Sequence, residues 1–330
     1  MDTAESYVYR VYLEKSFSRA AEKLYISQPS LSAAVARKER ELGFRIFDRS
    51  TKPVSLTARG AIYLEMLEEI AECERNMQRR VQKLSNDQHQ FIGIGGGSFS
   101  TYYLMTCICG AFYRRYPGVE VILDFGSFGA ASAISERISL FDKLDKGDLD
   151  AVFSYEYDTE RYDGIPVYSE RLVVAMHKSL VTPTLLPYAV SHEALLNESY
   201  DPACVLNGRG LFRDIPFLDF SRTSHTYRYM SDLLGDYVAS PHKITNSRHS
   251  VVHFNMMRAG AGALLVSDYV VAMSSVGQSD IVYFVFPKEA STRSIYLITK
   301  KEAVFHSNMR NFISLAKEIG SSRQTTPFYD

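Results

Sequence analysis

Hydrogen-bonding side chains gather at residues 27–32, and their types suit the recognition of another polar molecule. Gln28 carries an amide that both donates and accepts, and hydroxyls follow at Ser30 and Ser32. In the major groove of DNA a glutamine amide pairs bidentately with adenine, and a serine hydroxyl pairs with donors or acceptors. These residue types at this spacing therefore indicate contact with base edges, provided that a helix presents them.

Positive charges accompany these groups, as phosphate binding requires. Residues 1–60 hold eleven Lys or Arg against seven Asp or Glu, although the whole chain has a net charge of −1. The first 60 residues are thus basic and the rest of the chain is acidic. This asymmetry favours a polyanion as the partner of the N-terminal part only. The positively charged Arg37, Arg49 and Lys52 suit phosphates or a minor groove, where they position the protein rather than specify sequence. The full set of candidate DNA contacts is Ser18, Arg19, Ser27, Gln28, Pro29, Ser30, Ser32, Arg37, Arg49 and Lys52.

Helical periodicity predicts the scaffold that positions these residues. Residues 3–25 predict two helices, with Ser18 as the cap of the second. Ser27 is expected to cap a third helix that runs to Leu42. Residues 44–57 are two short apolar runs around a polar tip, which is typical of a hairpin. Three helices and a hairpin predict a winged helix-turn-helix, whose third helix fits a major groove of about 12 Å.

One long helix is predicted from residue 58 to about residue 85. Its apolar residues recur every three or four positions, close to a heptad pattern: Tyr63, Met66, Ile70, Cys73, Met77, Val81 and Leu84. A narrow stripe on so long a helix needs a partner, most simply the same helix of a second copy. The alternative is that the helix lies along its own domain.

The rest of the chain has an α/β pattern. Strand, helix, strand, helix and strand follow one another over residues 91–154, which predicts a parallel sheet with right-handed crossovers. The fold class is therefore α plus α/β: a winged helix-turn-helix, a long linker helix and an α/β domain. Further strands are expected at 172–177, 203–206, 244–245, 263–266 and 296–299, before a closing helix at 307–317.

The run of residues 16–60 resembles the DNA-binding signature of LysR-type transcriptional regulators. Looser similarity follows at residues 116–119, 147–150 and 259–262, so the resemblance covers nearly the whole chain. The matches in the first run are Ser16, Phe17, Ala20, Ala21, Leu24, residues 27–32, Glu39, Glu41, Leu42, Gly43, Phe47, Arg49, Leu56, Thr57 and Gly60.

The resemblance implies a homodimer through residues 58–85, further assembly into a tetramer, and a periplasmic-binding-protein-like effector domain of two lobes with an inducer in the cleft. Other implied partners are double-stranded DNA with a dyad-symmetric promoter site, and RNA polymerase. The expected domains are the DNA-binding domain 1–57, the linker helix and hinge 58–90, the effector-binding domain 91–320 (lobe I about 91–165 and 267–320, lobe II about 166–266) and the tail 321–330.

A few residues depart from the family pattern. Lys38 stands where an apolar core residue is usual, Lys52 replaces a common wing arginine, and Ser267 stands where proline is frequent. Ala33 and Ala34 stand where larger polar or basic residues often face DNA. These departures concern base preference and affinity rather than the mode of docking.

The glycine-rich loop at residues 95–101 is a candidate site for a small anion. It precedes a predicted helix, whose exposed N–H groups and dipole favour negative charge. Hydroxyls of Ser98, Ser100 and Thr101 can add hydrogen bonds, and the resemblance points to the same loop as an inducer contact. The loop fits no nucleotide-binding glycine motif. The alternative is a tight turn with a helix cap.

Other candidate effector contacts follow the ends of predicted strands. Ser127 and Phe128 would lie across the same switch point of the sheet. On the other lobe, Asn207, Asn246 and Ser247 are expected to contribute. The preference of the loop for negative charge predicts a small carboxylate or similar anion as inducer, and no cofactor.

Cysteines and histidines predict no metal site. Cys73, Cys107, Cys109 and Cys204 fit no zinc motif and are expected to be buried free thiols. His249 and His253 share the spacing of a helical metal pair, but no carboxylate or thiol lies at ligand spacing. Packed or solvated imidazoles are the simpler interpretation.

Three other interpretations compete with a DNA-binding regulator that a small molecule controls. An enzyme has little support, because the nucleophile-elbow, zinc-protease and nucleotide-loop motifs are missing. A solute-binding transport protein needs export, yet residues 1–17 lack the apolar segment of a signal peptide. Without an apolar run of roughly 18 residues as well, the cytoplasm is the expected location. A regulator gated by thiol oxidation is the third alternative.

Overall fold

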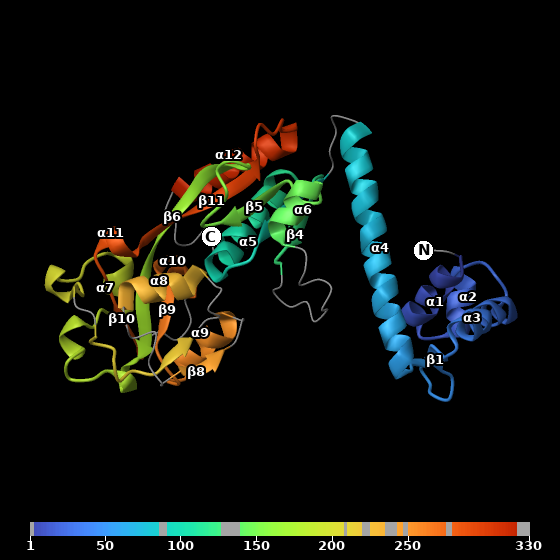
Figure 1. Ribbon diagram of the computed structural model, residues 1–330, viewed down its shortest axis with the longest axis horizontal. Coiled ribbons are helices and arrows are strands. Elements are labelled where there is room, and N and C mark those ends of the chain that lie inside the picture. Colours follow the sequence, from blue (N-terminus) through green and yellow to red (C-terminus); the bar gives the residue numbers. More distant parts are fainter. Residues whose placement is uncertain are drawn as a thin grey trace. The chain divides into compact units, whose positions relative to one another are not determined.

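The computed structural model describes residues 3–85, 91–126, 139–207, 210–219, 225–234, 243–246, 250–274 and 279–321. The chain divides into two compact units, Met1–Asn86 and Asp87–Asp330. Each unit encloses its own hydrophobic core, and Figure 1 labels the elements of both.

The first unit contains helices and a small wing. Its third helix follows the second after a short turn, and the two strands of the wing pair antiparallel. This arrangement confirms the predicted winged helix-turn-helix. The elements are α1 (Thr3–Glu14), α2 (Phe17–Lys23), α3 (Gln28–Leu42), β1 (Phe47–Asp48), β2 (Ser55–Leu56) and α4 (Ala58–Ser85).

Local signals set the helix ends of this unit. Ser27 caps α3 as predicted, and Gly43 ends it in the left-handed region at φ 76°. The cap of α2 is Ser16, whose Oγ accepts from the backbone N–H of Arg19, so the expectation for Ser18 was wrong. The helix begins earlier because the chain already turns at Lys15, which has a φ of 48°. Ser18 therefore lies inside the helix.

Contacts within the first unit explain why a lysine occupies position 38 and a glycine position 60. Lys38, at a usually apolar position, lies 3.5 Å from Glu5 Oε1, so an ion pair replaces the apolar contact. A Cβ at Gly60 would lie 2.0 Å from the backbone oxygen of Ile46, because the first turn of α4 crosses directly over this segment. Only glycine permits that approach.

The long helix α4 packs on its own domain along its first half. Tyr63, Leu64 and Leu67 belong to the core of the winged domain, as the alternative interpretation required. Farther along, the apolar side chains of Met77 and Val81 are each 52 % exposed. The apolar stripe therefore continues past the surface that the domain itself covers.

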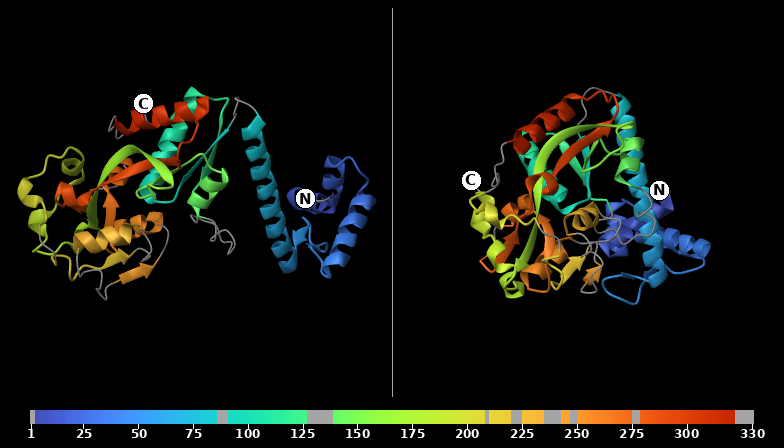
Figure 2. Two further views of the ribbon diagram at one scale, coloured as in Figure 1. Left: turned by 45° about the horizontal axis from the view of Figure 1, so that its top comes forward. Right: turned by 60° about the vertical axis from the view of Figure 1, so that its left-hand side comes forward.

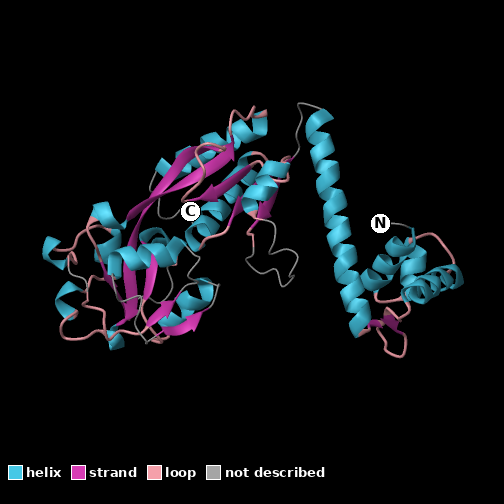
Figure 3. Cartoon of the chain, in the orientation of Figure 1, coloured by secondary structure: helices cyan, strands magenta, loops and turns pink. Residues whose placement is uncertain are grey.

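The second unit is built on a mixed seven-stranded sheet with the order β10-β6-β11-β5-β3-β4, and β9 pairs with β6 beside it. Figures 2 and 3 show helices packed against this sheet. The strands are β3 (Phe91–Gly96), β4 (Glu120–Asp124), β5 (Ala151–Ser154), β6 (Tyr162–His177), β9 (Leu264–Ser267), β10 (Ile281–Phe284) and β11 (Thr292–Lys300), with a separate parallel pair, β7 (Phe217–Asp219) and β8 (Lys243–Asn246). The helices are α5 (Phe99–Arg115), α6 (Leu140–Lys146), α7 (His192–Leu196), α8 (His225–Leu234), α9 (Ser250–Arg258), α10 (Asp268–Met273), α11 (Lys288–Ser291) and α12 (Ser307–Ser321).

The sheet confirms the predicted parallel strands and adds antiparallel ones. β3 pairs in parallel with β4 and β5, as the alternation of strands and helices predicted. β11 runs antiparallel to both β5 and β6. Within the described helices of the chain, none is long and apolar enough to cross a membrane.

The two largest hydrophobic clusters of the second unit define two lobes. The first lobe surrounds β3, α5 and α12, and the second surrounds the second half of β6 with β9 and β10. β6, the long green strand of Figure 2, belongs to both lobes. Residues 281–286 pack in the core of the second lobe, although they were expected in the first; the other domain limits remain a prediction.

Some strands differ from the prediction. β6 begins ten residues before the expected 172–177, because its first half, a mixture of polar and apolar residues, is held by pairing along β11. Residues 203–206 are not a strand. Residues Pro202–Cys204 form a short 3-10 helix that Asp201 caps, and Val205 makes one bridge to Val285. β7 and β10 were not predicted.

Candidate DNA-binding face and effector site

The start of α3 presents the predicted base-reading residues. Ser27 Oγ accepts from the N–H of Ser30 at 3.2 Å and lies 2.7 Å from Ser30 Oγ, so these two hydroxyls fix the first turn. Gln28 and Pro29 follow the cap and are exposed. Their position at the helix N-terminus is where recognition helices contact base edges.

The body of α3 is anchored from behind. Leu31 and Val35 are completely buried against α1 and α2, whereas Ala33 and Arg37 are exposed. The helix can therefore contact DNA on one face without losing its packing on the other.

Arg49 joins the wing to α3. Its Nη1 donates to Ser32 Oγ at 3.0 Å, and its Nη2 lies 3.4 Å from Glu39 Oε2. The guanidinium also lies 4.7 Å from the centre of the Phe17 ring, a cation–π distance. The same Glu39 accepts from the backbone of the wing through Oε1. Arg49 thus holds the interface together as well as presenting positive charge.

The remaining candidate DNA contacts lie on the surface around this helix. Ser18, Arg19 and Lys52 are all exposed. The guanidinium of Arg19 donates to the backbone oxygen of Glu14 at 2.6 Å, which ties α2 to the end of α1. The wing also carries negative charge, because hydrogen bonds from Ser50 lower the pKa of Asp48.

The glycine-rich loop is a capped helix start. Ser98 Oγ accepts from the N–H of Thr101, and Thr101 Oγ1 accepts from the N–H of Ser98, which is a capping box. A Cβ at Gly95 would lie 2.8 Å from a methyl carbon of Leu149, so a larger residue here would require that side chain to shift. These contacts are those of a tight turn with a helix cap. Binding of an anion by the loop stays a prediction.

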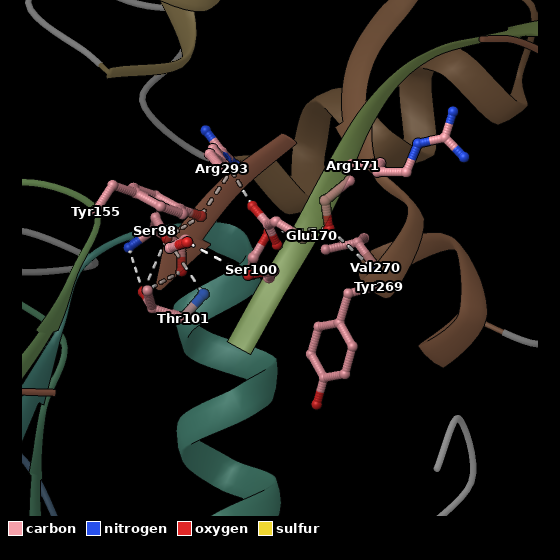
Figure 4. A network of polar contacts seen from close by, with 12 residues as sticks. Ser98, Ser100, Thr101, Tyr155, Glu170, Arg171, Tyr269, Val270 and Arg293 are labelled. Carbon is pink, nitrogen blue, oxygen red and sulfur yellow. Dashed lines mark hydrogen bonds and ion pairs between the residues drawn. The ribbon is translucent and has the colours of Figure 1, made fainter. Parts of the chain in front are cut away.

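Two hydroxyls of the same loop reach out of the first turn. Ser98 Oγ donates to the Tyr155 hydroxyl at 3.0 Å. Ser100 Oγ is buried and donates at 3.2 Å to Oγ of Ser267, which also caps α10. The serine at this frequently proline position therefore links the start of α5 to the end of β9, across the two lobes. Figure 4 shows Ser98, Ser100 and Thr101 at the start of α5.

Comparisons with known proteins give the front of the chain a family. Residues 6–61 match the family described as "Bacterial regulatory helix-turn-helix protein, lysR family". The Bacillus subtilis protein described as an uncharacterized HTH-type transcriptional regulator, YcgK, is 26% identical over 97% of this chain and 94% of its own length. The front of the chain is therefore a helix-turn-helix domain of the LysR family, and the chain is similar to a transcriptional regulator over nearly its whole length.

Partial matches add further relatives that are described as transcriptional regulators. A probable RuBisCO transcriptional regulator of Porphyra purpurea is 33% identical, over 50% of this chain and 51% of its own. This relative and the Bacillus subtilis protein are both described as transcriptional regulators and not as enzymes, in agreement with the interpretation of the sequence.

Solved structures show the same fold. Full-length CbnR in complex with its target DNA superposes with a TM-score of 0.56 at 17% identity, over 96% of this chain and 99% of that one. An OxyR mutant of Corynebacterium glutamicum gives a TM-score of 0.53 at 17% identity, over 97% and 91%. The fold class predicted from the sequence is confirmed.

Only two of the other candidate effector residues lie in the described part of the chain. Ser127, Phe128 and Ser247 lie outside the described residues. Asn207 is exposed after a buried Leu206, and Asn246 ends β8. Their role in binding an effector stays a prediction.

Sequence reasoning missed three buried polar residues beside the loop: Tyr155, Glu170 and Arg293. Arg293 Nε donates to Glu170 Oε1 at 2.6 Å, and Nη2 donates to the Tyr155 hydroxyl at 2.9 Å. Burial raises the pKa of Tyr155, so the phenol stays protonated. The available signal was the position of Glu170 just before the apolar run 172–176 of β6, and that of Arg293 near the start of β11.

Most of the cysteine thiols are at least partly shielded from solvent. Cys107 and Cys109 are buried, Cys204 is half-buried and Cys73 is exposed, so the expectation of burial was wrong for Cys73. Burial, and then the neighbouring Cys107, raise the pKa of Cys109 to about 12. Among the described residues, no three His, Cys, Asp or Glu side chains gather as a metal site.

Proposed function

We propose that this regulator binds a dyad-symmetric promoter site as a homo-oligomer, and that a small anionic inducer in the second unit modulates its binding or activation. The observation that carries the proposal is the start of α3, where Gln28 and Pro29 are exposed on a helix fixed by buried Leu31 and Val35. In this role it acts in the cytoplasm, where RNA polymerase is a further partner.

Dimer formation is supported by the uncovered stripe of α4. Met77 and Val81 are exposed on the half of the helix beyond its own domain. Nearer the domain, a groove of about 340 Å³ is lined by apolar side chains that include Phe44, Ile62 and Met66. A second copy of the helix would remove this surface from water, and apolar burial contributes about 25 cal/mol per Å². Further assembly into tetramers is part of the proposal.

The anionic inducer is supported by charge beside the start of α5. The N-terminus of this 17-residue helix favours a negative group. Arg293 is linked to Ser98 through the Tyr155 hydroxyl and is buried, with a side-chain exposure of 5%. The helix start favours an anion in this region, and the guanidinium, although paired with Glu170, keeps Nη1 without a hydrogen-bond partner among the described residues.

Inducer binding can reach the DNA-binding unit through a change in the lobes. The hydrogen bond from Ser100 to Ser267 joins the two lobes beside the proposed site. A ligand that binds one arrangement of the lobes better shifts the population toward it, by no more than its difference in affinity. We propose that this shift changes how dimers sit on DNA and how far the DNA is bent.

Two experiments test the proposal. The double variant Met77→Lys/Val81→Lys should convert dimers to monomers, as measured by light scattering, whereas Tyr113→Lys, at an exposed position of α5, should not.

Selection of genomic fragments followed by footprinting should give a two-fold symmetric site. Binding that stayed equal on specific and random DNA would contradict the DNA-reading role, and a footprint and bend unchanged by every small acid would contradict the inducer.

A further inference from the structure

Arg293 and Glu170 form a cross-strand ion pair inside the second unit. They are directly opposite each other in the register of β11 and β6. The side chain of Glu170 is 0% exposed and that of Arg293 is 5% exposed. Figure 4 shows Glu170 on the Arg293 side of β6, while Arg171 points to the other side. Both charges of the pair have therefore lost their contact with water.

Each member of the pair retains one unused atom. Arg293 uses Nε for Glu170 and Nη2 for Tyr155, and Glu170 uses Oε1. Among the described residues, Nη1 of Arg293 and Oε2 of Glu170 have no hydrogen-bond partner. Buried polar atoms without a partner are rare, because leaving them unpaired is costly. Here one is a charged donor, and the other is a charged acceptor.

The pair lies where the two lobes meet. The Arg293 guanidinium lies 3.8 Å from the ring centre of Tyr155 and 5.4 Å from that of Tyr229. Tyr155 packs in the core of the first lobe, and Tyr229 packs against the core of the second. The Tyr155 hydroxyl also accepts from Ser98. The pair is thus linked through Tyr155 to the loop to which the proposed function assigns the inducer.

We infer that this pair reads both polar groups of the inducer, and that the inducer is a small acid with a neighbouring donor, such as an amino acid or a hydroxy acid. The inference rests on the proposed function and specifies its ligand. Nη1 of Arg293 donates to the carboxylate, and Oε2 of Glu170 accepts from the ammonium or hydroxyl. The ligand enters when the lobes part, since both side chains are buried between them.

The charge of the pair explains why both groups are needed. A plain acid would satisfy Arg293 but place its carboxylate beside that of Glu170 and leave Oε2 unused. An amine without an acid would leave Nη1 unused beside a second cation. A hydrogen bond to a charged group changes affinity by about tenfold or more, so the pair discriminates between these classes.

The probes are the proteinogenic amino acids, their α-hydroxy acid analogues, the same skeletons without the α-substituent, and the decarboxylated amines. Binding to the full chain is measured by thermal shift and calorimetry. At least one amino or hydroxy acid should bind, its plain-acid counterpart should bind about tenfold more weakly, and its amine should not bind. Equal affinity for the plain acid would overturn the inference.

Substitutions assign the two contacts. Glu170→Gln should reduce the preference for the amino acid over the plain acid by about tenfold, and Arg293→Gln should weaken all acids. Removal of one partner of a buried ion pair destabilises the fold. The double variant Glu170→Gln/Arg293→Gln, checked by circular dichroism, therefore accompanies them and should lose the preference for acids. Arg171→Gln changes the adjacent, equally shielded arginine on the other side of β6 and should keep the order of affinities.

The outcomes separate this inference from the proposed function. If Ser98→Ala abolishes an acid response while Glu170→Gln leaves the order of affinities unchanged, the ion pair does not read the ligand and the proposed inducer site stands. If no acid of the panel shifts the melting temperature or DNA binding of the wild-type chain, both fail.

Discussion

Arg49 Nη1 lies 3.0 Å from Ser32 Oγ, so the residue after the first wing strand is hydrogen-bonded to the second turn of α3. Both residues were predicted to contact DNA, and the structure shows them contacting each other. A guanidinium with a side-chain exposure of 40% can still reach a phosphate while it keeps this bond. Arg49 therefore positions the wing and leaves part of its side chain accessible to a partner.

Arg49→Ala should loosen the wing as well as weaken DNA binding. It removes the contacts to Ser32, Glu39 and the Phe17 ring, with an expected cost of about 1–3 kcal/mol. The backbone N–H groups of Ile46 and Phe47, which donate to Glu39, should exchange with deuterium faster. Ser32→Ala is the control, since it removes one of these contacts; unchanged exchange in Arg49→Ala would contradict the positioning role.

Gln28→Ala should relax base preference. Its amide lies exposed at the start of α3, where a bidentate contact to adenine discriminates by about 1–3 kcal/mol. Affinity for the specific site should fall toward that for random DNA, measured by fluorescence anisotropy on both duplexes at one salt concentration. Equal losses on the two duplexes would show that Gln28 does not read a base.

Lys52→Ala should weaken binding to all sequences alike. The side chain is exposed in the wing, and a phosphate contact releases counterions without reading sequence. The slope of log affinity against log salt should become shallower by about one. Lys301→Ala, in the second unit, is the matched control and should leave the slope unchanged; a loss confined to the specific site would argue for a base contact by Lys52 instead.

Local chemistry explains why the first unit was predictable. Ser27 and Gly43 mark the ends of α3 by short-range hydrogen bonds and backbone conformation, and both signals are visible in the sequence. The cap of α2 was misplaced because Ser16 and Ser18 are both good caps, and only the turn at Lys15 decides between them.

Long-range pairing explains what the sequence hid. The first half of β6 has too little apolar alternation to identify it, and β11 holds it from a distant part of the chain. The meeting of Glu170 with Arg293 depends on that strand register, and the sequence does not specify it. The hydroxyls of Ser98 and Thr101 could be assigned to a helix cap from the sequence, but not the link to Tyr155.

Asp268 should make the stability of the second unit depend on pH. Burial raises its pKa to about 6, from 3.8, although hydrogen bonds from the N–H groups of Arg171 and Tyr269 oppose the shift. The folded state then holds the proton more tightly than the unfolded state. The resulting stabilisation is fully present below pH 3.8 and is lost as the pH rises through about 6, by about 3 kcal/mol at most.

Asp268→Asn tests this dependence, because an amide oxygen can accept the same two N–H groups without titrating. The melting temperature of the wild type relative to Asp268→Asn should fall between pH 4 and pH 7, measured by calorimetry. Asp268→Ala loses the acceptor and should be destabilised throughout this range. A constant difference between the wild type and Asp268→Asn would mean that Asp268 titrates normally.

Thiol labelling should follow burial. Cys73 is exposed on α4, whereas burial raises the pKa of Cys107 and that of Cys109. Iodoacetamide at neutral pH should label Cys73 first and the buried pair only after unfolding, as read by mass spectrometry. Retention of an effector response in Cys73→Ser would exclude gating by this thiol, and rapid labelling of Cys109 in the folded chain would contradict its shielding.

β6 has a mechanical consequence. One uninterrupted strand serves both lobes, and its pairing with β11 changes register between Ile295 and Tyr296. Rotation of one lobe against the other would therefore twist β6 itself. Contacts of the side chains near Glu170, where the lobes meet, therefore affect how far this strand can twist.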